Sequence, residues 1–233
     1  MENKKLKKIK LNYLDIRIIE CREPLVNLSD YDFVLEPVYF IENGWGEEKM
    51  YLREGVAKKL EETQKFLPVG CKFKIFDAFR SIQTQKKIYD DYKNKLKIKH
   101  PELRGEELEK AVQEFVVLPK LTKEAPPRHN TGGAVDLTIV DEKGKELDMG
   151  TSFDHFGEEA SLEYFFQFDN YQGMATENLE KIKENRKSLN LLMSRAGFSV
   201  YQNEWWHWEM GTQFRAFSCD LKYAKYGSAD LLD

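Results

Sequence analysis

Apolar side chains recur every three or four positions in four stretches of the chain, which is the spacing of one buried face of an α-helix. Within residues 176–196, Leu179 and Ile182 follow this spacing, and Gly197 stands where a left-handed residue ends a helix. Ser81 precedes another stretch and suits an N-terminal cap. The pattern predicts helices over residues 53–67, 81–97, 105–116 and 176–196.

Between the predicted helices lie short stretches with the pattern of half-buried strands. Residues 71–76 (CKFKIF) alternate between polar and apolar, and residues 134–140 (AVDLTIV) are alternating and rich in β-branched side chains. Residues 198–202 and 204–210 are also strand-like, and the second is dense in aromatic residues. Because the strands are short and some suggest hairpins, the pattern favours an α+β fold over a doubly wound parallel sheet.

The composition is that of a folded protein, because 41% hydrophobic and 13% aromatic residues are enough to build a sizeable core. The 233 residues suit one large domain or two small ones. The best candidate for a linker, residues 120–133, ends in the strongest motif, so we interpret it as a loop. We therefore expect a single domain over residues 1–233.

Charge and cysteine content indicate which partners and compartment to expect. The net charge of −4 gives no reason to expect nucleic acid as a partner. A basic arm (Lys4, Lys5, Lys7, Lys8 and Lys10) is interpreted as a solvated chain end, with a membrane-surface or nucleic-acid role as the alternative. The three cysteines lack CxxC spacing, and no apolar run suits a membrane span or a secretory signal. Cytoplasmic residence without membrane association is therefore expected.

The first chemical signal is a histidine followed seven positions later by an aspartate. His129 and Asp136 are separated by Gly132-Gly133, whose freedom to bend lets a loop histidine meet a carboxylate on the next strand. Imidazole nitrogen and carboxylate oxygen are both good zinc ligands. Taken alone, the pair also fits an exposed histidine and a surface aspartate.

The second signal is residues 204–208 (EWWHW). Glu204 lies three positions before His207, and in a regular strand such positions point to opposite faces. The two side chains share a site only if the chain bends at Glu204, and Asn203 favours a bend there. Glu209 is placed to orient the His207 imidazole or else faces solvent. The alternative for the segment is an aromatic core strand with an incidental histidine.

These segments resemble the motifs of a known family. Residues 128–138 (RHNTGGAVDLT) resemble the His-x-x-Gly-x-Ala-x-Asp zinc motif of the VanX-type D-alanyl-D-alanine dipeptidases, which belong to the zinc D,D-peptidase family. Residues 204–207 (EWWH) match their Glu-x-x-His motif, and residues 149–154 (MGTSFD) match a segment ending in a substrate-binding aspartate. Residues 77–80 (DAFR) resemble their Asp-Gly-Tyr-Arg segment. Four motifs in family order are more specific than any one of them.

The resemblance implies a metal site and a catalytic carboxylate. One zinc ion per chain would be bound by His129, Asp136 and His207, and Glu204 would be the general base and acid. Three protein ligands leave one zinc position open for water, whose pKa zinc lowers toward about 7.

The resemblance also implies residues that handle the substrate. Arg80 would stabilise the tetrahedral intermediate, and Asp154 would hold the free ammonium group of a small dipeptide. Without the resemblance, Arg80 also fits a helix cap and Asp154 a turn. Pro127 stands where family members commonly carry serine, and Phe79 replaces their tyrosine. Both departures leave the strict preference for D-Ala-D-Ala open.

The fold and activity that the resemblance implies can be stated together. We expect a small, mainly antiparallel central sheet flanked by helices, as in zinc D,D-peptidases and hedgehog-like proteins, with the catalytic part over about residues 50–210. The predicted activity is hydrolysis of D-alanyl-D-alanine. The alternatives are a D,D-carboxypeptidase or endopeptidase acting on longer cell-wall peptides, and a zinc-binding module without catalysis. Because such a module needs no base, Glu204 and Arg80 argue against it.

Overall fold

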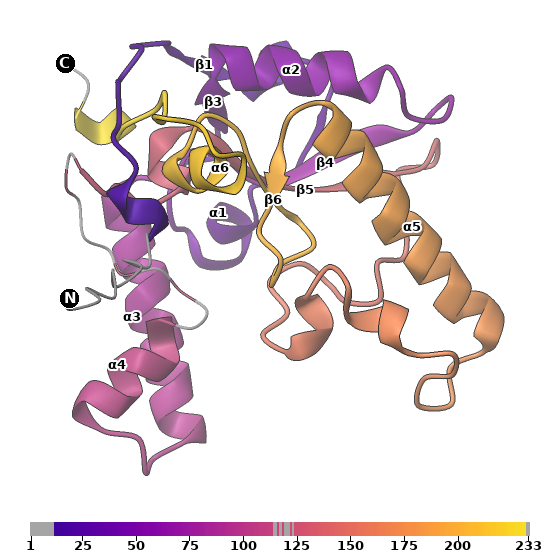
Figure 1. Cartoon of the computed structure of the whole chain (residues 1–233). Coiled ribbons are helices and arrows are strands. Elements are labelled where there is room, and N and C mark those ends of the chain that lie inside the picture. Colours follow the sequence, from indigo (N-terminus) through magenta and orange to yellow (C-terminus); the bar gives the residue numbers. More distant parts are fainter. Residues whose placement is uncertain (1–11, 114–115, 117, 119–121, 123, 232–233) are drawn as a thin grey trace, which may run out of the picture.

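Five strands form the central sheet of the molecule, in the order β2-β4-β5-β7-β6, and Figure 1 labels three of them, β4, β5 and β6. Every neighbouring pair is antiparallel except β2 and β4. The five strands are β2 (Val34–Leu35), β4 (Lys72–Asp77), β5 (Ala134–Val140), β6 (Ser199–Val200) and β7 (His207–Glu209). A separate antiparallel pair consists of β1 (Leu25–Asn27) and β3 (Tyr51–Arg53). The predicted α+β class with a mainly antiparallel sheet is confirmed.

The structure is a computed structural model that describes residues 12–231 except 114–115, 117, 119–121 and 123. The basic arm at residues 4–10 lies outside the described residues. The α-helices are α1 (Val38–Asn43), α2 (Glu54–Gln64), α3 (Ile82–Lys99), α4 (Gly105–Gln113), α5 (Thr176–Arg195) and α6 (Gln213–Ser218). Short 3-10 helices are η1 (Tyr13–Asp15), η2 (Leu28–Asp30), η3 (His129–Thr131), η4 (Glu158–Ala160), η5 (Tyr164–Gln167) and η6 (Ala229–Leu231).

The four predicted helices are present as α2 to α5, and their caps have a local cause. Ser81 accepts a hydrogen bond from the Thr84 backbone nitrogen at 3.2 Å and so caps α3. Gly197 follows α5 with a φ of 94°, a left-handed conformation that glycine adopts without strain. α2 ends at Gln64, three residues before its predicted end.

The two predicted C-terminal strands are shorter than expected, because the chain turns between them. The backbone nitrogen of Glu204 bonds to the carbonyl oxygen of Tyr201 at 3.0 Å, and that of His207 bonds to the carbonyl oxygen of Glu204 at 3.2 Å. These local bonds occupy the groups that a longer strand would use for pairing. The bend predicted at Glu204 is therefore present.

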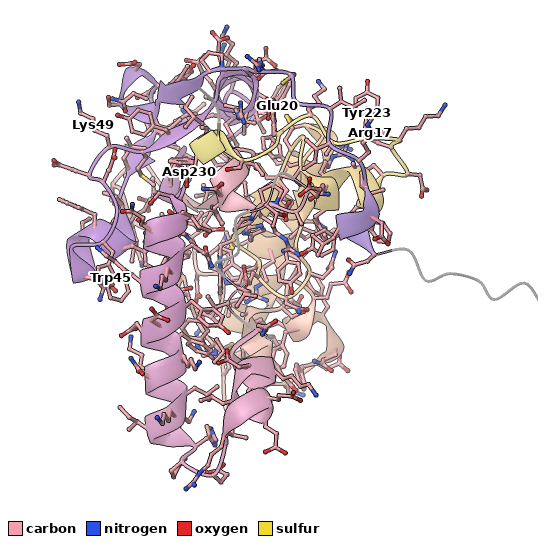
Figure 2. The ribbon with its side chains drawn as sticks, turned by 90° about the vertical axis from the view of Figure 1, so that its left-hand side faces the viewer. Arg17, Glu20, Trp45, Lys49, Tyr223 and Asp230 are labelled. Carbon is pink, nitrogen blue, oxygen red and sulfur yellow. The ribbon has the colours of Figure 1, made fainter. Side chains whose placement is uncertain are left out.

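Alternation along β5 separates an apolar face of the sheet from a polar face. Val135, Leu137 and Ile139 pack in the main core with side chains of β4, α2 and α5. Asp136 and Thr138 point to the opposite face, where they are also buried. On this polar side, α3 and α4 lie side by side and project from the molecule (Figures 1 and 2).

No helix in the described part of the chain combines the length and the apolar character needed to cross a membrane. The organisation of residues 1–233 as one domain stays a prediction.

Candidate metal centre and active site

Strand register places three polar side chains in a row on the polar face of the sheet. Asp136 of β5 pairs with His207 of β7 on one side and with Asp77 of β4 on the other. Directly opposed residues of antiparallel strands hold their Cβ atoms about 4.5–5.5 Å apart. Backbone pairing therefore brings these three side chains together.

A tight turn adds His129 to this row. Gly132 has a left-handed φ of 69° and turns the chain from η3 into β5. A Cβ atom on Gly133 would lie 2.5 Å from the carbonyl oxygen of Met210, so only glycine permits this close approach to the chain after β7. The two glycines thus allow the bend that the sequence predicts.

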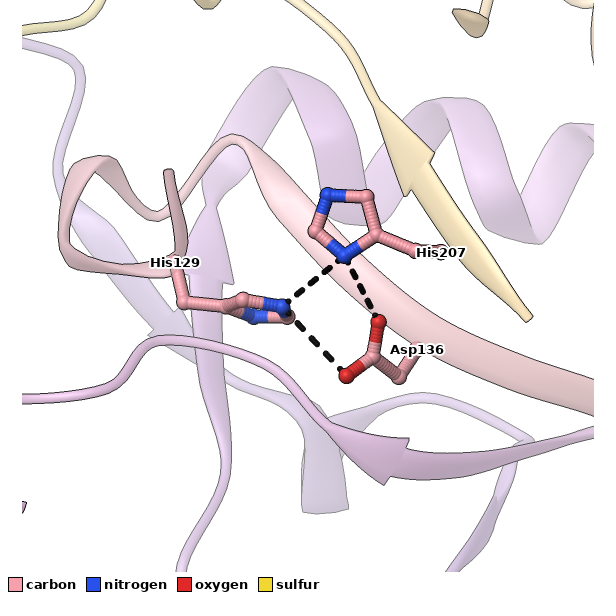
Figure 3. Close-up of side chains that lie close together, drawn as sticks. All are labelled: His129, Asp136 and His207. Atoms are coloured by element: carbon pink, nitrogen blue, oxygen red, sulfur yellow. Dashed lines mark hydrogen bonds and ion pairs between the residues drawn. The ribbon is translucent and has the colours of Figure 1, made fainter. Parts of the chain in front are cut away.

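The side chains of His129, Asp136 and His207 converge on one point (Figure 3). Nε2 of His129 lies 3.1 Å from Nδ1 of His207 and 3.3 Å from Oδ2 of Asp136. Nδ1 of His207 lies 2.9 Å from Oδ1 of Asp136. Ligand atoms held tetrahedrally at zinc–ligand distances near 2.0 Å are on the order of 3.3 Å apart. The observed separations therefore fit three ligands of a tetrahedral ion.

The outer nitrogen of each imidazole has its own acceptor. Nδ1 of His129 donates to the carbonyl oxygen of Ala78 at 2.8 Å, and Nε2 of His207 donates to Oε1 of Glu209 at 3.0 Å. With protons on these nitrogens, the inner nitrogens and Asp136 turn only lone pairs toward one another. Such a cluster requires a positive charge between its members, from a metal ion or a shared proton.

The pKa shifts in the cluster also indicate that it favours a positive charge between its members. Burial favours a neutral His207, but Asp136 and Glu209 outweigh burial and raise its pKa to about 10. Burial also disfavours an ionised Asp136, yet His129 and His207 hold the pKa of Asp136 below its usual value. The pocket thus stabilises a cation beside a carboxylate.

Glu204 lies beside the cluster without joining it. Its Oε2 is 3.8 Å from Nδ1 of His207, which leaves it next to the point where the three side chains converge. Burial raises the pKa of Glu204 to about 7, with His207 opposing this effect and Asp136 adding to it. A carboxyl group with a pKa near neutrality can both accept and donate a proton.

Arg80 is held rigidly at the edge of the pocket. Its Nε donates to Oδ2 of Asp77 at 2.9 Å, and Nη2 donates to the same oxygen at 2.5 Å. Nη1 donates to Oε1 of Gln85 at 2.8 Å, and the guanidinium lies 4.8 Å from the ring centre of Tyr39. Burial lowers the pKa of Arg80, but Asp77 and Tyr39 raise it by more than burial lowers it. The side chain therefore stays charged.

Asp154 faces the same pocket from a loop. Its backbone φ of 59° is left-handed, which is uncommon outside glycine. The hydroxyl of Tyr39 donates to Oδ2 of Asp154 at 3.0 Å. Burial raises the pKa of Asp154 to about 6, although Arg80 and the Tyr39 hydrogen bond oppose the rise.

Arg186 of α5 fixes the loop that carries Asp154. Its Nε donates to the carbonyl oxygen of Met149 at 2.7 Å, and its terminal nitrogens donate to those of Glu159, at 2.8 Å, and Ser161. Burial lowers the pKa of Arg186 to about 10, with Asp148 opposing. A fully buried cation whose donors all bind carbonyl oxygens therefore holds both ends of the loop.

With this geometry established, comparison with known sequences decides the family. A family model described as D-Ala-D-Ala dipeptidase matches residues 46–226. The chain belongs to this family. It is therefore a peptidase, and its α+β fold is the one that its resemblance to the zinc D,D-peptidases implied.

Relatives of this dipeptidase-family chain occur in several bacteria. A D-alanyl-D-alanine dipeptidase of Synechocystis sp. is 28% identical over 227 residues, covering 91% of each chain. A D-alanyl-D-alanine dipeptidase of Escherichia coli is 35% identical over 82 residues, covering 35% of this chain and 37% of the relative. A solved D,D-pentapeptidase, VanY, shares 16% identity and a TM-score of 0.40, covering 90% of this chain and 96% of that one, a likeness too distant to inform function.

In this dipeptidase-family protein, the six residues predicted from the motifs line one pocket: Arg80, His129, Asp136, Asp154, Glu204 and His207. The other two histidines lie outside the cluster and are partly exposed. His155 contacts Glu159 at 3.3 Å, and His100 contacts Glu102 at 3.2 Å.

Sequence reasoning assigned no role to several side chains that line this pocket, among them Tyr39 and Arg128. Tyr39 precedes the matched family region and lies in no motif, so nothing in the sequence marks it. Arg128 directly precedes His129, and this adjacency was the available signal.

Proposed function

We propose that this protein is a zinc-dependent dipeptidase that hydrolyses D-alanyl-D-alanine as a single catalytic domain in the cytoplasm. The observation that carries the proposal is the convergence of His129, Asp136 and His207, which leaves three lone-pair donors facing one another. The names of the relatives in Synechocystis and Escherichia coli support the choice of substrate.

The donor set suits one zinc ion per chain. Two imidazole nitrogens and one carboxylate oxygen are typical zinc ligands, and all three residues are buried. Calcium and magnesium prefer oxygen ligands, so the two nitrogens argue against them. When bound, zinc supplies a water of lowered pKa and polarises a carbonyl group.

Glu204 and Arg80 supply the other groups that hydrolysis needs. Glu204 accepts the proton of the attacking water at a carboxylate oxygen and passes it to the nitrogen of the leaving amine. Arg80 keeps a fixed positive charge at the pocket edge, where it stabilises the negative charge that develops on the carbonyl oxygen. Because Asp77 and Gln85 hold Arg80 in place, little reorganisation is required during the reaction.

Asp154 selects substrates with a free amino terminus. In its ionised form it pairs with the ammonium group of a dipeptide, and the Tyr39 hydroxyl directs one of its oxygens. An N-acylated substrate lacks this charge and adds bulk at the same place.

A second candidate function is that of a D,D-carboxypeptidase acting on longer peptides. A hollow lined by His155, Tyr164 and Asn203 adjoins the active-site pocket and shares Asp154 and Glu204 with it. The pocket therefore continues past Asp154, which gives a longer peptide room to extend.

Amine release from a panel of D,D-, L,D- and L,L-dipeptides with added zinc tests the proposal, with N-acetyl-D-Ala-D-Ala included. We expect hydrolysis of D-Ala-D-Ala and little reaction of the acetylated form. An unpaired buried carboxylate costs about 2–5 kcal/mol, which corresponds to roughly thirty-fold to several thousand-fold in kcat/KM. Equal cleavage of both substrates would establish the carboxypeptidase instead.

A further inference from the structure

The imidazole of His207 is held from behind by side chains outside the metal cluster. Oε1 of Glu209, which is fully buried, accepts the hydrogen bond from Nε2 of His207 at 3.0 Å. The second oxygen of Glu209 accepts a hydrogen bond from Oγ1 of Thr212 at 2.5 Å. Nε of Arg128 lies 3.3 Å from Oε1, the oxygen that also holds the histidine. One carboxylate therefore links a histidine to an arginine.

Three aromatic rings fix the position of the Arg128 guanidinium. Its central carbon lies 4.2 Å from the ring centre of Tyr201, 4.6 Å from that of Phe214 and 5.2 Å from that of Tyr13. These rings come from the segment after β6, from α6 and from η1. A guanidinium stacks well on aromatic faces, and burial strengthens the attraction. The charge beside Glu209 is thus placed by three separate parts of the fold.

We propose that Arg128 and Glu209 act as a pair of positioning residues that hold His207 with Nδ1 toward the zinc ion and so increase zinc affinity. The inference rests on the proposed function. A fully buried carboxylate requires an opposite charge, and Arg128 supplies it. A charged acceptor on the outer nitrogen fixes the tautomer of a histidine ligand and increases its basicity.

The two histidine ligands differ in this respect. The outer nitrogen of His129 donates to the carbonyl oxygen of Ala78 at 2.8 Å and lies 3.4 Å from Oδ2 of Asp77, which already accepts from Arg80. The outer nitrogen of His207 instead donates directly to a carboxylate, that of Glu209. Hydrogen bonds to ionised acceptors are the stronger kind. Because Arg128 directly precedes His129, its side chain also ties the segment carrying one ligand to the strand carrying the other.

The test is the zinc dissociation constant of the full chain, measured by competition with a chelator, together with the midpoint of thermal unfolding. The variants are Glu209→Gln, Arg128→Met, Arg128→Lys and the Arg128→Met/Glu209→Gln double variant. Arg215→Met is the matched control, because Arg215 is another partly buried arginine, and its Nε donates to the carbonyl oxygen of Gly197.

We expect Glu209→Gln and Arg128→Met each to weaken zinc binding by about 10–100-fold. The zinc dissociation constant of the double variant should lie within about threefold of that of whichever single variant binds zinc more weakly. The reason is that both changes act through one hydrogen bond, from His207 to Glu209. Arg128→Lys keeps the charge and should recover part of the loss. Arg215→Met should bind zinc like the parent even where its unfolding midpoint falls.

Parent-like zinc affinity in both Arg128 variants would overturn the inference, as would losses that simply add in the double variant. Either result would reduce Arg128 to a packing role, which the unfolding midpoint of Arg128→Met, compared with that of Arg215→Met, measures independently of zinc. A parent protein that binds no zinc would instead overturn the proposed function. Visible absorption of the Co²⁺-loaded proteins gives a second readout, because a reoriented His207 changes the ligand field whereas a packing defect elsewhere does not.

Discussion

The proposed metal end of the pocket, at His129, Asp136 and His207, and the proposed substrate end, at Asp154, are built in different ways. Asp136 and His207 stand opposite each other on paired strands, so backbone hydrogen bonds set their separation. Asp154 stands on a loop, in a left-handed conformation, and depends on Arg186 and Tyr39 for its place. On the paired strands, many backbone hydrogen bonds hold the side chains in position, whereas on the loop a few side-chain contacts hold Asp154. Single substitutions in the loop that carries Asp154 should therefore disturb substrate recognition without disturbing the metal.

Removing a metal ligand gives the largest expected effect. His207→Ala leaves two protein ligands, so the purified variant should lose most of the nearly one equivalent of zinc expected for the parent, and activity should fall to background. Elemental analysis and amine release from D-Ala-D-Ala measure the two quantities. Full zinc content in this variant would mean that the ligand set is wrong.

Glu204→Ala should separate catalysis from metal binding at the same end of the pocket. The side chain lies outside the ligand cluster, so zinc content should match the parent. Loss of a general acid–base group typically lowers the rate about 10²–10⁴-fold. Activity within a few-fold of the parent would exclude the role of base, and loss of zinc would make Glu204 a ligand.

The sequence predicts the metal end better than the substrate end for the same physical reason. The alternation along residues 134–140 and the bend at Gly132-Gly133 are local signals, and they place Asp136 on a strand just after the turn that carries His129. The pairing of Asp136 with His207 joins residues 71 positions apart, and the sequence did not predict it. β5 has the predicted bounds, residues 134–140. Its alternating sequence predicts a strand with one exposed face, but all seven residues are buried. β5 is buried throughout because neighbours cover both faces of the sheet.

Side chains that act over long sequence separations carried no such signal. Tyr39 lies 115 residues from Asp154, and no period or motif connects them. Arg186 is one of several charged residues on α5 and is indistinguishable in sequence from its solvent-facing neighbours. Its burial emerges only when the loop folds against the helix. The roles proposed for the motif residues stay predictions until the variants are measured.

Asp154→Ala tests the substrate end directly. The variant should lose about 10²-fold in kcat/KM on free D-Ala-D-Ala, because the ammonium group loses its charged partner. Its zinc content should stay at the parent level. The ratio of kcat/KM for free D-Ala-D-Ala to that for the N-acetylated substrate should decrease, mainly because kcat/KM for the free dipeptide falls. An unchanged ratio would assign Asp154 to the turn rather than to the substrate.

Arg186→Met tests whether the loop depends on one buried cation. Several carbonyl oxygens would lose their donor, so the free energy of unfolding should fall by roughly 2–3 kcal/mol. KM for D-Ala-D-Ala should rise with the loss of loop order, while zinc affinity stays unchanged. Urea denaturation and steady-state kinetics measure these effects. Zinc loss that parallels the rise in KM would show that the two ends are not independent.

Tyr39→Phe should have the smallest effect on activity, and it tests whether the Tyr39 hydroxyl orients the carboxylate of Asp154. The ring still packs against the Arg80 guanidinium, so only the hydroxyl that donates to Asp154 is lost. One such hydrogen bond contributes about 0.5–1.5 kcal/mol, which corresponds to roughly two- to tenfold in KM. The change should appear in KM rather than kcat, because binding of the ammonium group precedes the chemical step.

In an Asp154→Ala background the same substitution should leave KM and kcat unchanged, because the hydroxyl acts through the carboxylate. A loss of kcat in Tyr39→Phe with KM unchanged would instead show that the tyrosine serves Arg80 during the reaction.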